Sequence, residues 1–117
     1  MPPKNTAGKN RYMEDNTNNP KIIGLLTICR KAGRLTVGFD MSVEAIKKGK
    51  AELVILASDI SPKTEKEIRF FAAKKNTAVL KSDMTMEELG SVQGRKTGIA
   101  AVCDKGFAAR FTELIRP

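Results

Sequence analysis

The stretch Gly38–Asp59, GFDMSVEAIKKGKAELVILASD, decides the fold of this chain. A glycine precedes a short amphipathic segment, predicted to be helical from about Asp40 to Lys48, and Gly49 ends it. The apolar run 53–57 follows at once and predicts a central strand that is covered on both faces. A basic protein with a glycine at a helix start also offers a place for an anion, and phosphate is the obvious one.

The same alternation of helix and strand extends from residue 20 to the C-terminus. Asn19-Pro20 and Ser61-Pro62 each read as an N-cap followed by proline at the first helical position. A capping box begins at Thr85. Strands are predicted at 35–37, 53–57, 77–80 and 99–102, with helices between them and a final helix after them. The pattern predicts one α/β domain, residues 20–117, with a single sheet between helical layers.

Residues 1–19 are polar and have few apolar anchors, which predicts a disordered tail. The alternative is a basic arm that folds onto RNA. The tail nets only +1, from three basic against two acidic residues, so we favour the first interpretation.

The composition favours a polyanionic partner. The net charge is +8, from 21 Lys and Arg against 13 Asp and Glu, and the alternative is that extra lysines only keep the domain soluble. Clustering of the cations at element ends favours a ligand. The clusters are Arg30, Lys31 and Arg34; Lys47, Lys48 and Lys50; and Arg95 with Lys96.

Enzymatic chemistry has little support. The chain contains no histidine and no G-x-G-x-x-G, so we expect no catalysis, no metal and no cofactor. Cys29 and Cys103 are expected to be buried reduced thiols rather than a disulfide. Asp59 could act as an acid after the central strand, but capping or bracing the Ser61-Pro62 turn is the favoured role. Without a membrane-spanning or signal segment, a cytoplasmic protein is expected.

The segment 90–97, GSVQGRKT, invites comparison with a nucleotide-binding P-loop. Arg95 stands where that motif needs its second glycine, and the segment follows a helix instead of a strand, so ATP binding is rejected. Two interpretations stay open: a basic loop that contacts RNA phosphate, or an ordinary exposed turn.

Aromatic side chains are sparse, with five Phe and one Tyr. Phe70, Phe71, Phe107 and Phe111 are predicted to lie mostly in the core. Phe39, beside the glycine that opens the small helix, is the candidate for an exposed contact. A stacking platform for single strands needs aromatic residues interleaved with basic ones, so a folded RNA suits the sequence better.

The order of these segments resembles the kink-turn-binding ribosomal protein superfamily, and most of all its small bacterial YlxQ-like members. The resemblance covers residues 20–115 and is carried by residues 31–38, 45–62 and 97–102. It implies a three-layer α/β/α sandwich around a mixed four-stranded sheet. It also implies an RNA surface made of the first strand, the second helix start and the loop before the last strand, here Arg34–Gly38, Phe39–Lys48 and Gly94–Thr97.

The sequence departs from the superfamily pattern at the second helix. Tight binders carry glycine, any residue, Asn, Glu, two further residues and Lys. Gly38 matches, whereas Asp40, Met41 and Glu44 stand at the Asn, Glu and Lys positions. An ionised Asp only accepts hydrogen bonds, Met41 removes an acceptor, and Glu44 repels phosphate.

Two hypotheses follow. The first is a monomeric, non-catalytic protein that binds a structured RNA, with ribosomal RNA as one candidate. Its predicted RNA-binding residues are Arg34, Thr36, Gly38, Phe39, Asp40, Lys47, Lys48, Arg95, Lys96 and Thr97. The alternative is a protein-interaction module on the same fold that has lost direct RNA readout, with a ribosomal protein or translation factor as its partner.

Overall fold

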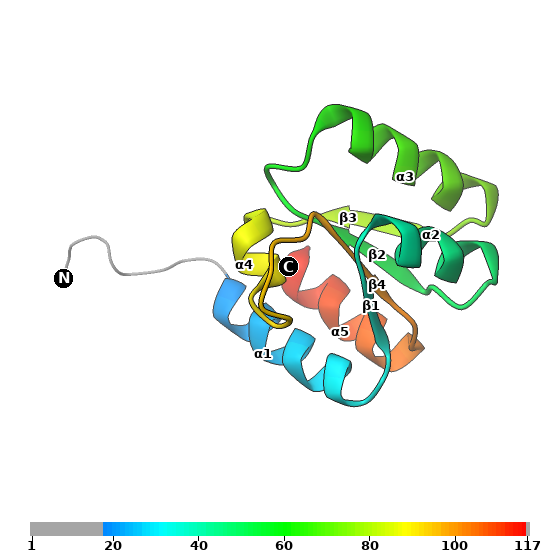
Figure 1. Cartoon of the computed structure of the whole chain (residues 1–117). Helices are drawn as coiled ribbons and strands as arrows, with labels where there is room; N and C mark the ends of the chain where they lie inside the picture. Colours follow the sequence, from blue (N-terminus) through cyan, green and yellow to red (C-terminus); the bar gives the residue numbers. More distant parts are fainter. Residues whose placement is uncertain (1–17, 117) are drawn as a thin grey trace, which may run out of the picture.

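Helices and strands alternate along the chain, as predicted. The computed structural model describes residues 18–116 (Figure 1). In chain order the elements are α1 Asn19–Lys31, β1 Leu35–Val37, α2 Phe39–Lys47, β2 Leu53–Leu56, α3 Pro62–Lys74, β3 Ala78–Lys81, α4 Met86–Gly90, β4 Ile99–Val102 and α5 Lys105–Ile115. The predicted ends of the strands and of α2 coincide with these bounds or differ from them by one residue. Each of the described helices is too short or too polar to span a bilayer.

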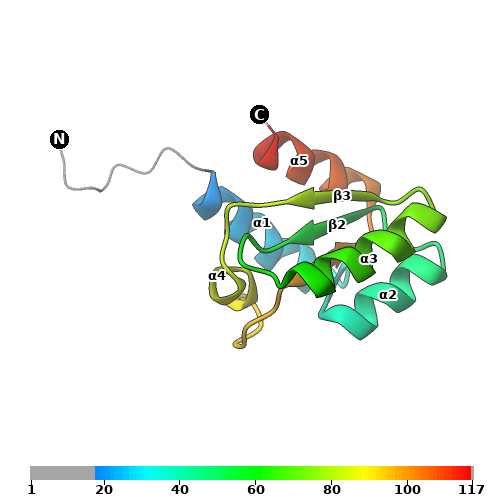
Figure 2. The same cartoon turned by 90° about the horizontal axis from the view of Figure 1, so that it is seen from above.

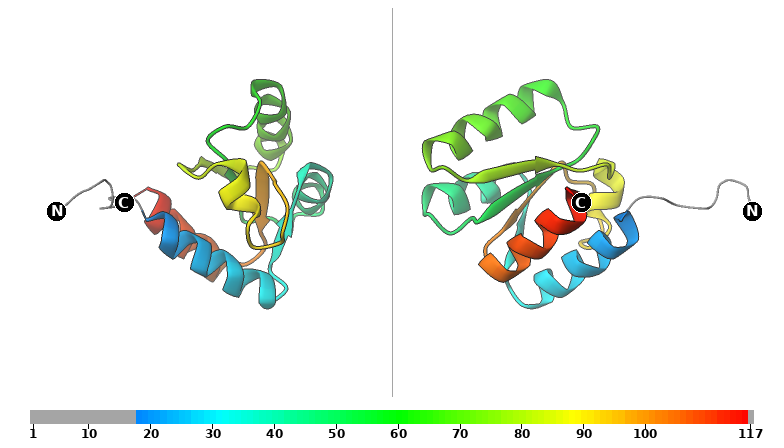
Figure 3. Two further views of the ribbon diagram at one scale, coloured as in Figure 1. Left: turned by 60° about the vertical axis from the view of Figure 1, so that its left-hand side comes forward. Right: turned by 180° about the vertical axis from the view of Figure 1, so that it is seen from behind.

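The four strands form one mixed sheet in the order β1-β4-β2-β3. β2 and β3 are parallel, and the two pairings of β4, with β1 and with β2, are antiparallel. α1 and α5 pack together on one face of the sheet, and α2 and α3 pack together on the other (Figure 3). The expected three-layer α/β/α sandwich with a mixed four-stranded sheet is therefore confirmed.

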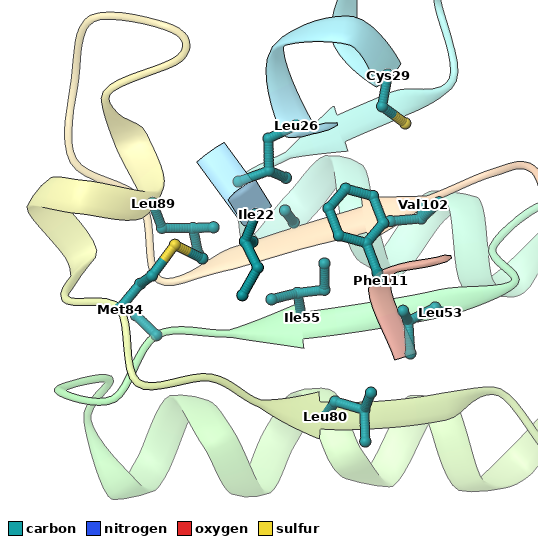
Figure 4. Close-up of a cluster of buried hydrophobic side chains, with 12 residues drawn as sticks. Ile22, Leu26, Cys29, Leu53, Ile55, Leu80, Met84, Leu89, Val102 and Phe111 are labelled. Atoms are coloured by element: carbon teal, nitrogen blue, oxygen red, sulfur yellow. The ribbon is translucent and has the colours of Figure 1, made fainter. Parts of the chain in front are cut away.

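The central strands supply both halves of the core because their side chains alternate between the faces. Leu53 and Ile55 of β2 point into the cluster under α1 and α5, where Phe111 and Leu26 meet them (Figure 4). Val54 and Leu56 instead join the cluster under α2 and α3. Burial on both sides explains why the sequence of β2 is a continuous apolar run.

Side-chain caps fix most of the helix starts. Ser61 Oγ accepts from Thr64 N at 3.2 Å, and Thr85 forms the predicted capping box with Glu88. Asp59 was assigned wrongly, because its Oδ1 accepts from Met86 N at 2.8 Å. It therefore braces the start of α4 and not the Ser61-Pro62 turn. The partner lies 27 residues away, which no local pattern could reveal.

The start of α1 differs from the prediction. α1 begins at Asn19, and the residue at the N-cap is Asn18, which makes no side-chain cap hydrogen bond. Asn18 Nδ2 instead donates to Leu114 O at 2.9 Å and so ties the two ends of the domain together. The rest of the predicted tail, residues 1–17, lies outside the described residues.

Cys29 and Cys103 are both free thiols, buried and half-buried respectively. Burial and the nearby charge of Asp104 raise the pKa of Cys29 to about 11, so this thiol stays protonated at neutral pH.

The assignment of Phe70 to the core was wrong, because Phe70 is 57% exposed, whereas Phe111 is fully buried.

Candidate nucleic-acid interface

Two parts of the chain that are distant in sequence meet at one end of the sheet. β1 and β4 are antiparallel, with Val37 opposite Ala100, so β1 ends where β4 begins. The backbone N–H of Gly38 then donates to Ile99 O at 2.9 Å. The end of β1, the start of α2 and the loop that precedes β4 are therefore neighbours, as Figure 1 shows.

Gly38 makes the turn from strand to helix in one residue. Its φ of +95° and ψ of 163° belong to a region that only glycine adopts readily. Its carbonyl oxygen accepts from Ser42 N at 3.1 Å and begins the hydrogen-bond ladder of α2. The exposed side chains of the first α2 turn, Asp40 and Met41, therefore stand directly beside the end of β1.

The loop between α4 and β4 is held by its own backbone. Gly94, with a φ of +85°, donates from its N–H to Gly90 O at 3.1 Å, and Thr97 N donates to Met86 O at 3.1 Å. The loop also crosses directly over Gly90. A Cβ on Gly90 would overlap Arg95 O and would lie 2.8 Å from Lys96 Cα. Sequence reasoning took Gly90 only as a helix end and missed this packing role.

The predicted RNA-binding residues differ in exposure: some are exposed, some are half-buried and one is buried. The exposed ones are Arg34, Asp40, Lys47, Lys48, Arg95 and Lys96, and the half-buried ones are Thr36, Gly38 and Phe39. Thr97 differs from the rest, because it is buried and its hydroxyl donates to Ile99 O at 3.0 Å. Thr97 therefore supports the loop from inside the domain, and the other predicted RNA-binding residues lie at the surface.

The exposed cations are not equally free. Lys48 Nζ lies 2.9 Å from Glu44 Oε2, and this hydrogen bond holds the pKa of Glu44 below its usual value. Lys47 Nζ lies over the ring of Phe71, 5.1 Å from its centroid. Within residues 18–116, Arg34, Arg95 and Lys96 form no ion pair with a carboxylate. The charges of these three side chains are therefore not neutralised by an ion pair.

The arrangement of these side chains suits the binding of an anionic ligand. Arg95 and Lys96 of the 91–98 loop lie on the side of the start of α2, which is a favourable site for phosphate groups. Lys47 and Lys48 lie instead at the last turn of α2, and Arg34 precedes β1, where its carbonyl oxygen accepts from Cys103 N. Across the described part of the chain, His, Cys, Asp and Glu side chains form no group that could hold a metal ion.

Replacing Ser42 by alanine is expected to raise the free energy of unfolding by about 1 kcal/mol. Ser42 lies in α2 and is fully buried, and its Oγ has no hydrogen-bond partner among the residues that the structure describes. Alanine removes this unsatisfied hydroxyl and also favours the helix. Urea denaturation of both proteins measures the change, and a less stable variant would show that the hydroxyl has a partner.

Several known proteins are similar to this chain in sequence. The model of the ribosomal protein L7Ae/L30e/S12e/Gadd45 family matches residues 21–111. The large ribosomal subunit protein eL30 of Candida albicans is 30% identical over 95 residues, which are 80% of this chain and 90% of that protein. The RNA-binding protein YlxQ of Enterococcus faecium is 26% identical and covers 84% of this chain and 94% of its own length.

A solved structure shows the same fold. It belongs to a protein with unknown function from Bacillus halodurans, with a TM-score of 0.76 and 28% sequence identity. The match covers 83% of this chain and 98% of that one. The likeness therefore includes all three layers of the sandwich.

Proposed function

The chain belongs to the ribosomal protein L7Ae/L30e/S12e/Gadd45 family, and from this premise we propose that it binds a structured RNA of the kink-turn type. Two of its relatives are named a large ribosomal subunit protein and an RNA-binding protein. These relatives also confirm the prediction that the chain is not an enzyme. Ribosomal RNA is the first candidate ligand, and we place the protein in the cytoplasm as a monomer.

The observation that carries the proposal is the hydrogen bond from Gly38 N to Ile99 O. It holds the start of α2 against the loop of Arg95 and Lys96, so one RNA can touch both. In the proposed complex Arg34, Lys47, Arg95 and Lys96 contact phosphate groups. Gly38 lets the RNA backbone come close because it has no side chain.

Base recognition falls to the first turn of α2. In the proposed complex Phe39 and Asp40 touch bases, and Thr36 lies on the preceding strand, β1. An ionised Asp accepts hydrogen bonds but donates none, so Asp40 favours the exocyclic amino groups of adenine, cytosine and guanine. The Glu44–Lys48 ion pair neutralises both charges locally, and Lys48 therefore contributes less to phosphate binding than Lys47. The RNA preference of this chain then differs from that of members with Asn, Glu and Lys at these positions.

Ultraviolet crosslinking in cells tests the proposal. We expect one structured RNA to dominate the sequenced fragments, with crosslinked peptides that contain Phe39 or Arg95. The affinity of the purified protein for that RNA is expected to fall roughly 100-fold between about 50 and 200 mM salt, as four phosphate contacts require. RNA recovery at background level, or a salt-independent affinity, would contradict direct phosphate binding.

A protein-interaction module is the second candidate. Met41 is 58% exposed where tight RNA binders carry a carboxylate, and an exposed apolar side chain suits a protein contact. A ribosomal protein or translation factor that stays bound after nuclease treatment and high salt would favour this function. Loss of the partner under either treatment would favour RNA.

A further inference from the structure

An apolar groove lies between α2 and α3, which run side by side in Figure 2. Its volume is about 490 Å³, and it is lined by Phe39, Lys66, Glu67, Phe70 and Phe71. Three of the five phenylalanines of the chain therefore come together at one surface. Phe70 is 57% exposed there, which is a large apolar area to leave in water.

Cations surround the rings of this groove. Phe70 and Phe71 meet edge to face, with 5.6 Å between their ring centroids. Lys74 Nζ lies 4.5 Å from the centroid of Phe70, and Lys47 Nζ lies 5.1 Å from that of Phe71. The fold thus brings together aromatic and basic side chains of two helices that are separated in the sequence.

We propose that this groove holds unpaired nucleotides that flank the folded RNA. The inference rests on the proposed function, because Phe39 belongs both to the start of α2 and to the groove. RNA seated at the start of α2 can therefore continue into the groove without a break. One base stacks on Phe70, and the neighbouring phosphates lie near the lysines.

The charges around the groove favour RNA over a peptide as its ligand. Lys66 and Glu67 line the groove with opposite charges, and the ammonium groups of Lys47 and Lys74 lie over its rings, so positive charge predominates at the rings. A nucleotide presents a flat base to the rings and a phosphate to the ammonium groups, and so uses both features. The lysine chains are flexible, so a base that displaces an ammonium group from a ring leaves it free to reach the phosphate.

Binding of matched RNAs tests the proposal. The probes are a kink-turn duplex and the same duplex with a single-stranded extension of about six adenosines. We expect the extension to tighten binding to the unmodified protein by about fivefold or more, the contribution of one stacked base. Phe70→Ala should abolish this gain and leave binding of the plain duplex unchanged. Ile28→Ala is the matched control, because Ile28 is 58% exposed on α1, in the other helical layer.

The outcomes separate the two proposals. If the plain duplex binds and the extension adds nothing, or if Phe70→Ala keeps the gain, the groove is not a nucleotide site and the proposed function still stands. If the plain duplex fails to bind, the kink-turn proposal fails, and nuclear magnetic resonance with the oligoadenylate alone judges the groove. Amide shifts at Phe39 and Phe71 that vanish in Phe70→Ala would support it. Shifts there with an acidic peptide but not with oligoadenylate would overturn it in favour of a protein ligand.

Discussion

Reversing two charges, Lys47→Glu together with Arg95→Glu, is expected to weaken RNA binding by about 100-fold or more. Both side chains are exposed, Arg95 in the loop before β4 and Lys47 in the last turn of α2. Each change removes a charged contact that contributes about 1.5 kcal/mol or more and adds repulsion. Two such losses correspond to about two powers of ten in the dissociation constant.

Stability should change little in this variant. Lys47 gives up its position over the Phe71 ring, which costs about 0.5–1 kcal/mol at an exposed site. Fluorescence anisotropy with the crosslinked RNA measures the affinity, and circular dichroism checks the fold. Lys105→Glu with Arg110→Glu is the matched control, because it changes the net charge equally but lies on α5, in the opposite layer. Equal losses in both variants would show that only overall charge matters.

Replacing Gly90 by alanine is expected to damage both stability and RNA binding. The new Cβ would overlap Arg95 O and lie 2.7 Å from the carbonyl carbon of the same residue, so the loop backbone must move outward. Overpacking of this kind costs about 1–3 kcal/mol. The displaced loop carries Arg95 and Lys96, and we expect RNA affinity to fall about tenfold, the loss of one charged contact.

The control for this substitution is Gly24→Ala in α1. Apart from its chain neighbours and the backbone of its own helix, no atom of the described residues lies within 4 Å of the position that its Cβ would take, and alanine favours the helix by about 0.5–1 kcal/mol. Thermal unfolding and RNA titration of both variants give the comparison. If Gly90→Ala matched the unchanged protein in both measurements, the loop could not cross Gly90 as closely as described.

Local patterns predicted most of the fold. The caps at Ser61 and Thr85 act within three residues, and the run 53–57 shows its burial directly in its composition. The role of Asp59 and the exposure of Phe70 were beyond such patterns. Both depend on what the other elements bring near them, and helix periodicity places a side chain on a face without showing what covers that face.

The sequence likewise predicted only some features of the candidate site. Gly38 and the exposed cations follow from a glycine before a helix and from charges at element ends. The burial of Thr97 and the loop crossing at Gly90 arise from backbone packing, which composition does not encode. The aromatic groove needs Phe39 and Phe70 on neighbouring helices, although 31 positions separate them in the sequence. The roles of the ten residues in RNA binding stay predictions.

The strand order β1-β4-β2-β3 has a consequence for how the protein is made. β1 leaves the ribosome early, but its sheet partner β4 is synthesised near the C-terminus and inserts between β1 and β2. During translation the nascent chain carries β1 as an unpaired strand until residues 99–102 emerge. Pairing across such a sequence separation closes late in folding. Assembly of the Gly38 junction is therefore coupled to completion of the chain, and truncated products cannot form it.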